Sequence, residues 1–573
     1  MQSVGLEIHF VHLSVMDVLT TFHQSCIEAL CHPSHLLYHQ FASYEWFMRE
    51  ALPHVLEEHQ DLELDGHSFK LCNPTFMLPC VKESKSGTWQ DVTPYSARKR
   101  KLTYANVLMM DVEHQFENNC TLYKDVHFCN IPTMVNSSFC RGNTTDLGGY
   151  FIIKGHEKTI VSQEMLKQNQ LFVAKKTSGK FTIQGEIRSR HDLKFRSTST
   201  MYIKVAKTTH QVVINLPFVE RRPGALLDIP IQFLFTILEQ DVNCNLMELI
   251  CTTTDHTTHY HLWHTIHQAM YGQDCENLSV EDMIDWIGQH GTKEMTVQKR
   301  REIVHHILTH ECLPHLGMNK SAQTRKCKVL YLGRVVRHLF LVATGHKPFD
   351  DRDDYENKRV LTPGYILINF FRQILRRFLH NIKNVLRRSM QGGSFRNVSD
   401  AFHAKSITAG LRFALATGNW SIQRGNQHQL LGVSQRTDRH TYPSYIGQMR
   451  KINTPGVNNE GKNPKPRQCY AKTWGLLCPT ETPEGKPVGL VKNLAIGARV
   501  RLGLSSHLLI PFCQGLFVPL MECTWEQRST LPPLFVNGVY LGHVPDQVEC
   551  IKQLKLRRCA GDILADTSIF SKN

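Results

Sequence analysis

The sequence predicts an α+β protein built from several domains, and three observations lead to that prediction. The chain has 573 residues, more than one hydrophobic core usually supports, so about three to five domains of roughly 100 to 200 residues are expected. Some segments alternate apolar and polar residues, as strands do, and others carry apolar residues at helical spacing. No internal repeat or low-complexity tract stands out.

The first half of the chain mixes one helix with many strands. Residues 36–50 carry apolar side chains at helical spacing, and strand-like pieces follow to about residue 175. Residues 201–207 and 211–216 alternate around Thr208-Thr-His210, which predicts a β-hairpin.

Helical patterns dominate after Ile229. Ser279 and Asp282 form a capping box at the start of one predicted helix, three apolar residues line its face, and Gly291 lies just past its end. A longer helix is predicted over residues 364–388. Its apolar residues recur every four positions while basic residues occupy the rest, so we expect a buried face and a basic exterior; the apolar residues are Ile366, Phe370, Ile374 and Phe378.

Positive charge is concentrated in one part of the chain. The chain has 66 Lys and Arg against 51 Asp and Glu, a net charge of +15. Residues 350–470 alone contain 20 Lys and Arg against 8 Asp and Glu, a net charge of +12. A local excess of this kind is expected where a protein meets a phosphate backbone. A solvated basic face is the alternative.

The cysteines and the amino terminus indicate an intracellular, soluble protein. The 18 cysteines are spread over the whole chain without a Cys-x-x-Cys pair, so we expect reduced thiols. The amino terminus lacks a basic region before its apolar residues, and Glu7, His9 and His12 break the apolar run, so it is a poor signal peptide. No apolar run approaches the roughly 18 residues that span a bilayer, so no membrane partner is expected.

One segment resembles a phosphate-binding loop without meeting its requirements. Residues 456–462 fit G-x-x-x-x-G-K, but Asn463 replaces the required Ser or Thr. Pro464 and Pro466 also disfavour the helix whose amino terminus would hold the phosphate. A flexible, cationic hairpin between two strands is the better interpretation.

Two groups of residues suggest metal binding, and in both cases another interpretation is favoured. Residues 350–354 (DDRDD) offer four carboxylates, but Arg352 weakens the field that would attract Mg²⁺, so a structural role is expected. The His-rich stretches have no zinc-finger spacing, so hydrogen-bonded or solvent-facing helix positions explain them as well as zinc does; they contain His256, His259, His261, His264 and His267, then His305, His306, His310, Cys312 and His315.

Glu481 and Glu484 lie in a turn shaped by Pro483 and Gly485, which would fix the directions of the two carboxylates. Acid–base chemistry is one use for such a pair. A capping or ion-pair role is the commoner one.

Four blocks between residues 424 and 491 combine paired cations, amides, Gly and Pro too closely for one regular element, so we expect loops presented on a scaffold. They are residues 424–435 (RGNQHQLLGVSQ), 449–455 (MRKINTP), 465–468 (KPRQ) and 478–485 (CPTETPEG).

These blocks resemble the fork region in the second-largest subunit of multisubunit DNA-dependent RNA polymerases of the eukaryotic, archaeal and large-DNA-virus type. Residues 146–158 (DLGGYFIIKGHEK), 350–359 (DDRDDYENKR) and 534–540 (LFVNGVY) are similar to three further blocks of the family, in the family's order. The resemblance extends from about residue 36 to nearly the end. It implies a protrusion over residues 1–175 and 350–415, an inserted lobe over 176–349, a fork over 416–495, and the start of an external region over 496–573.

The resemblance also implies where the nucleic acid lies. Arg467 and Glu484 would lie close to the active centre, and the predicted nucleic-acid contacts are Gln435, Arg450, Lys451, Lys462, Lys465 and Gln468. The family's catalytic Mg²⁺ is held by an aspartate triplet of the largest subunit, and no such triplet occurs here. No catalytic residue or metal ligand is therefore expected in this chain.

The resulting prediction is the amino-terminal part of a split or truncated second-largest subunit, inactive alone. Its expected partners are the largest subunit, the complementary carboxyl-terminal half, the DNA template and the RNA–DNA hybrid. Its expected location is the nucleus or cytoplasm or, if the protein is viral, the virion or the cytoplasm of the infected cell. Residues 553–558 (QLKLRR) are expected to help assembly. The alternative is a stand-alone nucleic-acid-binding or regulatory protein derived from such a subunit.

Overall fold

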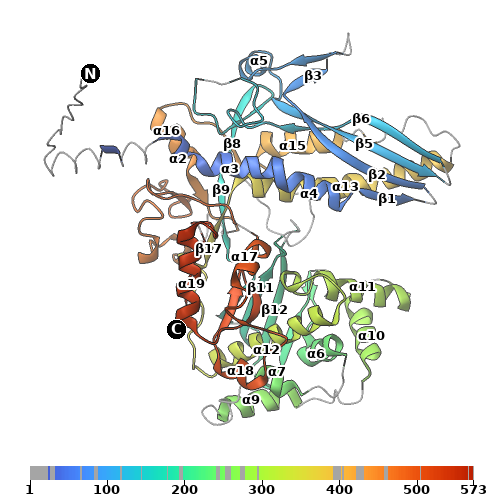
Figure 1. Cartoon of the computed structure of the whole chain (residues 1–573), viewed down its shortest axis with the longest axis vertical. Helices are drawn as coiled ribbons and strands as arrows, with labels where there is room; N and C mark the ends of the chain where they lie inside the picture. Colours follow the sequence, from blue (N-terminus) through green and yellow to red (C-terminus); the bar gives the residue numbers. More distant parts are fainter. Residues whose placement is uncertain are drawn as a thin grey trace, which may run out of the picture. The chain divides into compact units, whose positions relative to one another are not determined.

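A computed structural model describes most of the chain (Figure 1). The described residues are 24–25, 32–64, 67–82, 88–116, 119–142, 145–176, 179–192, 196, 198–222, 224–240, 245–251, 260–271, 278–292, 294, 296–391, 402, 405–420, 432–456, 463–503, 505–565 and 567–571. The chain divides into two compact units. The first comprises residues 1–165, 360–422 and 428–502, and the second comprises residues 166–359, 423–427 and 503–573.

The largest sheet of the first unit is antiparallel and has the strand order β1-β2-β5-β6. Its strands are β1 (Asp61–Leu64), β2 (His67–Met77), β5 (Ala105–Phe116) and β6 (Asn119–Pro132). In β1 every second residue is buried, which is the pattern of a sheet with one covered face. A hairpin of β3 (Cys80–Lys82) and β4 (Trp89–Asp91) and the short helix α5 (Pro94–Lys99) follow β2 in the chain.

Helices pack beside this sheet (Figure 1). They are α3 (Tyr38–Trp46), the π-helical turn η1 (Phe47–Ala51), α4 (Leu52–Glu58), α13 (Pro363–Gln391) and α15 (Lys405–Thr417), preceded by α2 (Pro33–Leu36). The predicted first helix is confirmed, although a π-helical turn interrupts it. The predicted long helix is also confirmed, as α13, and its four apolar residues at four-residue spacing are buried.

Helices α3 and α13 approach each other at Gly364. The Gly364 N–H donates to the Ser43 hydroxyl at 2.7 Å, and that hydroxyl donates to Thr362 Oγ1 at 2.8 Å. A Cβ atom at Gly364 would lie 1.9 Å from the Ser43 carbonyl oxygen. Only glycine therefore permits this packing.

Two small sheets of the first unit bring distant segments of the chain together. One has the order β18-β8-β7, and the other β17-β9-β19-β20. Their strands are β7 (Phe151–Ile153), β8 (His156–Ile160), β9 (Ser162–Leu166), β17 (Lys358–Leu361), β18 (Ser434–Arg436), β19 (Lys451–Asn453) and β20 (Val491–Asn493). Residues 151–166 thus form the scaffold on which residues 434–493 are arranged.

The second unit contains a five-stranded antiparallel sheet of order β10-β11-β12-β13-β16. Its strands are β10 (Leu171–Lys175), β11 (Phe181–Ser189), β12 (Ser199–Ala206), β13 (Val212–Asn215) and β16 (Ile229–Pro230), and β14 (Glu220–Arg222) pairs with β15 (Ala225–Leu226) beside it. The predicted hairpin is confirmed as β12–β13, and His210 in its turn has φ +52°.

Helices cover the core of the second unit. They are α6 (Ile231–Glu239), α7 (Leu246–Ile250), α9 (Tyr260–Tyr271), α10 (Val280–Gly291), α11 (Val297–His310) and α12 (Ala322–Ala343), with the 3₁₀ turns η2 (Pro314–Leu316) and η3 (Tyr355–Asn357). The predicted capping box at Ser279 is present at the start of α10. Gly291 is the last residue of this helix rather than the one after it, because the Thr292 N–H still donates to the Gly288 carbonyl.

The last part of the second unit is a three-stranded sheet with three helices. Their bounds are β21 (Val518–Pro519), β22 (Pro533–Val536), β23 (Val539–His543), α17 (Ser506–Cys513), α18 (Trp525–Thr530) and α19 (Gln547–Ala560). The division of the chain into five domains stays a prediction. Within the described residues, no helix is both long and apolar enough to cross a membrane.

Candidate nucleic-acid interface

Strand β18 carries Gln435 and is anchored on β8. It pairs antiparallel with β8, so that Gln435 lies opposite Thr159. Ser434 and Thr437 on either side are buried, and the Thr437 hydroxyl lies 3.0 Å from that of Thr159. Gln435 itself is exposed, and its amide donates to the Gly432 carbonyl at 3.3 Å. The strand therefore presents the Gln435 side chain outward from a fixed backbone.

A network of two arginines and two carboxylates joins residues 146–157 to the segment after β18. Arg439 donates to Glu157 at 2.8 Å and to Asp146 at 2.9 Å, and Arg98 donates to Glu157 at 2.8 Å. The Arg439 guanidinium also lies over the rings of Tyr150 and Tyr445, at 4.9 and 4.6 Å from their centroids. Partial burial lowers the pKa of Arg439, but the hydrogen bonds to Glu157 and Asp146 and the charge of Glu157 raise it by more, so the net shift of the pKa is upward.

Arg450 lies in the interior, although it was predicted as a nucleic-acid contact. It follows α16 (Tyr442–Met449), which starts with a capping box between Thr441 and Ser444. Its guanidinium donates to the backbone carbonyls of Leu36 at 2.8 Å, Ala495 at 2.6 Å and Ala498 at 3.2 Å. Only 5% of the residue is exposed.

Burial lowers the pKa of Arg450, and the charge of Glu481 partly offsets that shift. Because its donors are used by backbone carbonyls, the structure gives Arg450 a positioning role and does not support direct contact with a phosphate. It ties residues near Leu36 to the end of the segment that includes β20.

Strands β19 and β20 form the base from which the next loops extend. β19 pairs antiparallel with β20 and parallel with β9. Lys492 on β20 donates to Glu164 at 2.7 Å, and the Thr454 hydroxyl donates to the same buried carboxylate at 3.0 Å. Lys492 is therefore neutralised within the unit, whereas Lys451 on β19 is half-buried and alternates with the buried Ile452.

The hairpin predicted after β19 is only partly supported. Residues 457–462, which include the predicted contact Lys462, lie outside the described residues. Where the description resumes, the chain forms the 3₁₀ turn η4 (Lys465–Arg467) and not the expected second strand. Pro464 and Pro466 lack the backbone N–H groups that a strand would need, and the antiparallel partner of β19 is the later strand β20.

Arg467 fixes the turn that contains Glu484. Its guanidinium donates to the carbonyls of Lys486 at 2.8 Å and Val488 at 2.6 Å. Gly489 packs against the Arg467 backbone with φ +70°, and a Cβ atom at Gly489 would lie 2.5 Å from the Arg467 carbonyl oxygen. The structure thus brings the two residues predicted near the active centre onto adjoining segments.

The turn itself is held by internal hydrogen bonds. The Gly489 N–H donates to the Thr482 hydroxyl at 2.9 Å, that hydroxyl donates to the Val491 carbonyl at 3.0 Å, and the Asn493 amide donates to the Glu481 carbonyl at 3.1 Å. The Glu484 side chain is exposed. Its carboxylate is therefore presented outward by a fixed backbone.

The outer loops, residues 463–490, carry exposed cationic, amide and aromatic side chains. Lys465 and Gln468 are exposed, and Trp474, which follows the 3₁₀ turn η5 (Ala471–Thr473), is 83% exposed. Sequence reasoning did not single out Trp474, because the sequence does not show whether a tryptophan is buried. An exposed indole in a segment that also carries exposed cations can stack on a nucleobase while the cations meet phosphates.

The acidic block at residues 350–354 makes structural contacts. Asp350 accepts the Val173 N–H at 2.8 Å, Arg352 pairs with Glu186 at 2.9 Å, and Asp354 caps η3. Residues 350–359 belong to the second unit. In the part of the chain that the structure describes, no three His, Cys, Asp or Glu side chains are grouped to hold a metal ion.

The described His-rich residues lie on helices or in the core. His306 and His310 stack on α11 with ring centroids 4.4 Å apart, and Cys312 and His315 are buried. His315 Nδ1 lies 2.6 Å from the Ser189 hydroxyl oxygen. His256 and His259 fall outside the described residues.

Comparisons with known proteins identify the class. The family model described as RNA polymerase beta subunit matches residues 35–409, and the model described as RNA polymerase Rpb2, domain 3, matches residues 435–500. The chain belongs to the family of second-largest subunits of DNA-directed RNA polymerases. Its mixed α+β, multidomain architecture agrees with that family.

Individual relatives come from eukaryotes and archaea. DNA-directed RNA polymerase II subunit RPB2 of Encephalitozoon cuniculi is 33% identical over 86% of this chain and 44% of that protein. DNA-directed RNA polymerase II subunit 2 of Arabidopsis thaliana is 30% identical over 93% of this chain and 48% of that protein. DNA-directed RNA polymerase subunit Rpo2 of Sulfolobus acidocaldarius is 27% identical over 92% of this chain and 47% of that protein. The chain thus spans about half the length of these relatives.

Proposed function

We propose that this chain lines the nucleic-acid cleft of a DNA-directed RNA polymerase and supports template-directed RNA synthesis together with the largest subunit. Membership of the family supports the enzyme class. The observation that carries the cleft placement is the outer loop segment, in which Arg467 and Gly489 fix the backbone while Lys465, Gln468 and Trp474 are exposed. Fixed backbone with exposed cationic and aromatic side chains is suited to holding a nucleic acid.

The side chains divide into two roles in this proposal. The exposed side chains of Gln435, Lys465 and Gln468 meet phosphates or bases, and so does the half-buried Lys451. Lys462, which lies outside the described residues, is proposed as a further contact, and Glu484 lies near the active centre. Arg450 and Arg467 act as positioning residues through backbone carbonyls. The catalytic Mg²⁺ would be held by the largest subunit, where it stabilises the charge of the transferring phosphate.

The proposed partners are the largest subunit, the complementary part of the second-largest subunit, the DNA template and the RNA–DNA hybrid. This complementary part would supply what the other half of the relatives' length contains, in the same chain or in a separate one. We further propose that the protein acts inside the cell, in the nucleus or the cytoplasm. If the protein is viral, it acts in the virion or in the cytoplasm of the infected cell.

Reconstitution tests the proposal. The chain is combined with the largest subunit and the complementary part, and RNA synthesis is measured on a preassembled template scaffold. We expect synthesis by the assembly and none by the chain alone. Robust synthesis by the pure chain, or failure to assemble despite nucleic-acid binding, would contradict the proposal, and the second outcome would favour a stand-alone nucleic-acid-binding protein.

Arg467→Ala provides the matched variant in the same assay. Loss of the two hydrogen bonds to Lys486 and Val488 should loosen the Glu484 turn. We expect elongation to slow about tenfold or more with assembly unchanged, because small misplacement near reacting groups is costly. Lys99→Ala, an exposed lysine on α5, should elongate at the parental rate.

A further inference from the structure

Helix α19 uses one side to pack within its own unit. Asp546 caps its start by accepting the N–H groups of Val548 and Glu549, and Gly561 ends it with φ +89°. Cys550 and Leu554 are buried in a small core with Cys513, Val544 and Ile563. A deletion of residues 545–573 would remove part of this core and so disturb folding. The role in assembly predicted for residues 553–558 is therefore better tested with single surface substitutions.

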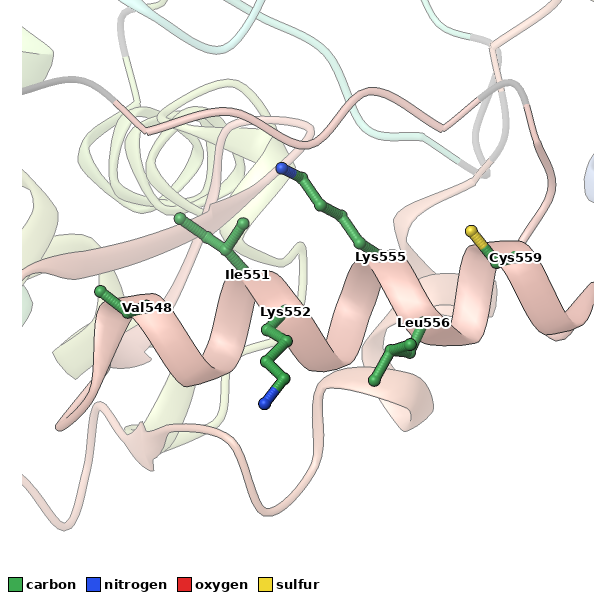
Figure 2. A pocket seen from close by; sticks show the side chains of 6 residues that line it. All are labelled: Val548, Ile551, Lys552, Lys555, Leu556 and Cys559. Atoms are coloured by element: carbon green, nitrogen blue, oxygen red, sulfur yellow. The ribbon is translucent and has the colours of Figure 1, made fainter.

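The opposite side of α19 is apolar where a surface helix is usually charged. Val548 is 78% exposed and Leu556 is 53% exposed, and the exposed Cys559 lies on the same side. Together with Ile551, Lys552 and Lys555 they line a shallow, open hollow of about 370 Å³ on this face of the helix (Figure 2).

The side chains around the hollow form two rows at four-residue spacing. Within this one face, Ile551, Lys555 and Cys559 form the row along one edge, and Lys552 and Leu556 form the row along the other edge (Figure 2). From Val548 to Cys559 the face extends about 16 Å, at about 1.5 Å per residue. A furrow between two such rows accepts a ridge of side chains from a second helix.

The cations beside the hollow indicate the charge of its occupant. Arg557 and Arg558 donate to the carbonyls of Phe512 and Thr567, so they are used within the unit. Lys552 and Lys555 are exposed instead, and among the described residues the one carboxylate paired with them is Glu549, 3.7 Å from Lys552. The hollow is therefore flanked by positive charge.

We propose that this face of α19 binds an acidic amphipathic helix of a protein partner. The partner's apolar ridge would enter the hollow, and its carboxylates would lie beside Lys552 and Lys555. A second copy of this chain fits less well, since it would set lysines against lysines. A nucleic acid fits less well too, since the centre of the face is apolar. The proposal goes beyond the cleft function and does not depend on it.

Cys559 allows docking to be measured directly on the full chain. The probe is a synthetic 16-residue helical peptide, with Leu at every third or fourth position and Glu flanking each Leu, and maleimide labelling of Cys559 is followed by mass spectrometry. We expect labelling to slow about tenfold at saturating peptide, because apolar burial excludes the reagent. The exposed thiols of Cys120 and Cys469 serve as internal references and should label at an unchanged rate. A peptide with Lys in place of Glu should not protect Cys559.

Surface variants separate docking from folding. Leu556→Glu should weaken peptide binding about tenfold or more, whereas Leu508→Glu on α17, where the leucine is 56% exposed, should leave it unchanged. Both should keep the parental melting temperature. The double variant Lys552→Glu/Lys555→Glu should no longer bind the peptide that contains Glu, and it should bind the peptide that contains Lys.

Three outcomes would overturn the proposal. The first is equal protection of all three thiols, or none. The second is self-association of the chain through this face, seen as dimers in sedimentation that Leu556→Glu disrupts. The third is protection of Cys559 by anionic lipid vesicles in place of the acidic peptide.

Discussion

Two neighbouring regions of the first unit use their cations in opposite ways. In the inner layer, residues 436–453 and 491–498, three cations are used internally: Arg439 binds two carboxylates, Arg450 binds backbone carbonyls, and Lys492 binds Glu164. In the outer loops, residues 463–490, Lys465 and Gln468 are exposed. A surplus of Lys and Arg therefore identifies the stretch that meets a polyanion, but only burial and pairing identify the side chains that remain available.

The largest effect is expected from Arg450→Ala in the inner layer. Removing the guanidinium takes a donor from the carbonyls of Leu36, Ala495 and Ala498, of which Ala495 still accepts the Ala498 N–H. It also leaves a gap where the buried side chain was, so the free energy of unfolding should fall by about 3 to 5 kcal/mol. Urea unfolding followed by fluorescence measures this change. Arg450→Lys should recover only part of it, since one amine cannot reach all three carbonyls. A loss of unfolding free energy below about 1 kcal/mol would contradict the structural role given to Arg450.

The contact between α3 and the inner layer should also be sensitive to acid, through His39 of α3 at Met449. Burial lowers the pKa of His39 to about 4, with a smaller opposing effect from its hydrogen bond to the Met449 carbonyl, 3.0 Å away. The unfolded chain therefore binds a proton near pH 6.5 that the folded chain does not take up until about pH 4. Stability should fall with decreasing pH across this window, by about 1.4 kcal/mol for each unit of pKa shift.

Comparison of variants isolates the His39 contribution, because His315 and His338 in the second unit also have lowered pKa values, about 3 and 4, chiefly through burial. His39→Gln should reduce the dependence of unfolding free energy on pH between 6.5 and 4 by up to about one proton. His440→Gln, at a side chain that is 94% exposed, is the matched control. Parallel curves for parent and His39→Gln would contradict the prediction.

The contrast between the two regions also separates what the sequence could predict from what it could not. Spacing alone predicted α13, and the Ser279 capping box predicted the start of α10, because both depend on residues near one another in the chain. The burial of Arg450 depends on Leu36, 414 positions away, so no local pattern could reveal it. The second hairpin strand was predicted wrongly although a local signal spoke against it, since Pro464 and Pro466 disfavour a strand.

In the outer loops, Trp474→Ala should weaken binding of single-stranded nucleic acid without changing stability. Loss of one stacked base costs about 1 to 3 kcal/mol, which corresponds to about a fivefold to hundredfold weaker affinity in fluorescence anisotropy. Tyr95→Ala, which removes a ring that is 70% exposed on α5, should bind as the parent does. Equal affinities for both variants would mean that Trp474 faces a protein partner instead.

A smaller effect is expected from Lys465→Ala. If its ammonium meets a phosphate, the slope of log affinity against log salt should fall by about 0.7 to 0.9, uniformly across nucleic-acid sequences. Lys462→Ala should behave in the same way, and Lys99→Ala should leave the slope unchanged. A change that depends on the base sequence would indicate direct base contact.

The position of the nucleic acid is tested most directly by photocrosslinking in the reconstituted enzyme. A benzophenone amino acid is placed at Gln468 in the outer loops, or at Lys99 as a control that is also exposed. The enzyme is then irradiated on a scaffold with separately labelled DNA and RNA strands. We expect a crosslink to nucleic acid from position 468 and none from position 99. Absence of a crosslink from position 468 in an enzyme that still synthesises RNA would contradict the placement of the outer loops in the cleft.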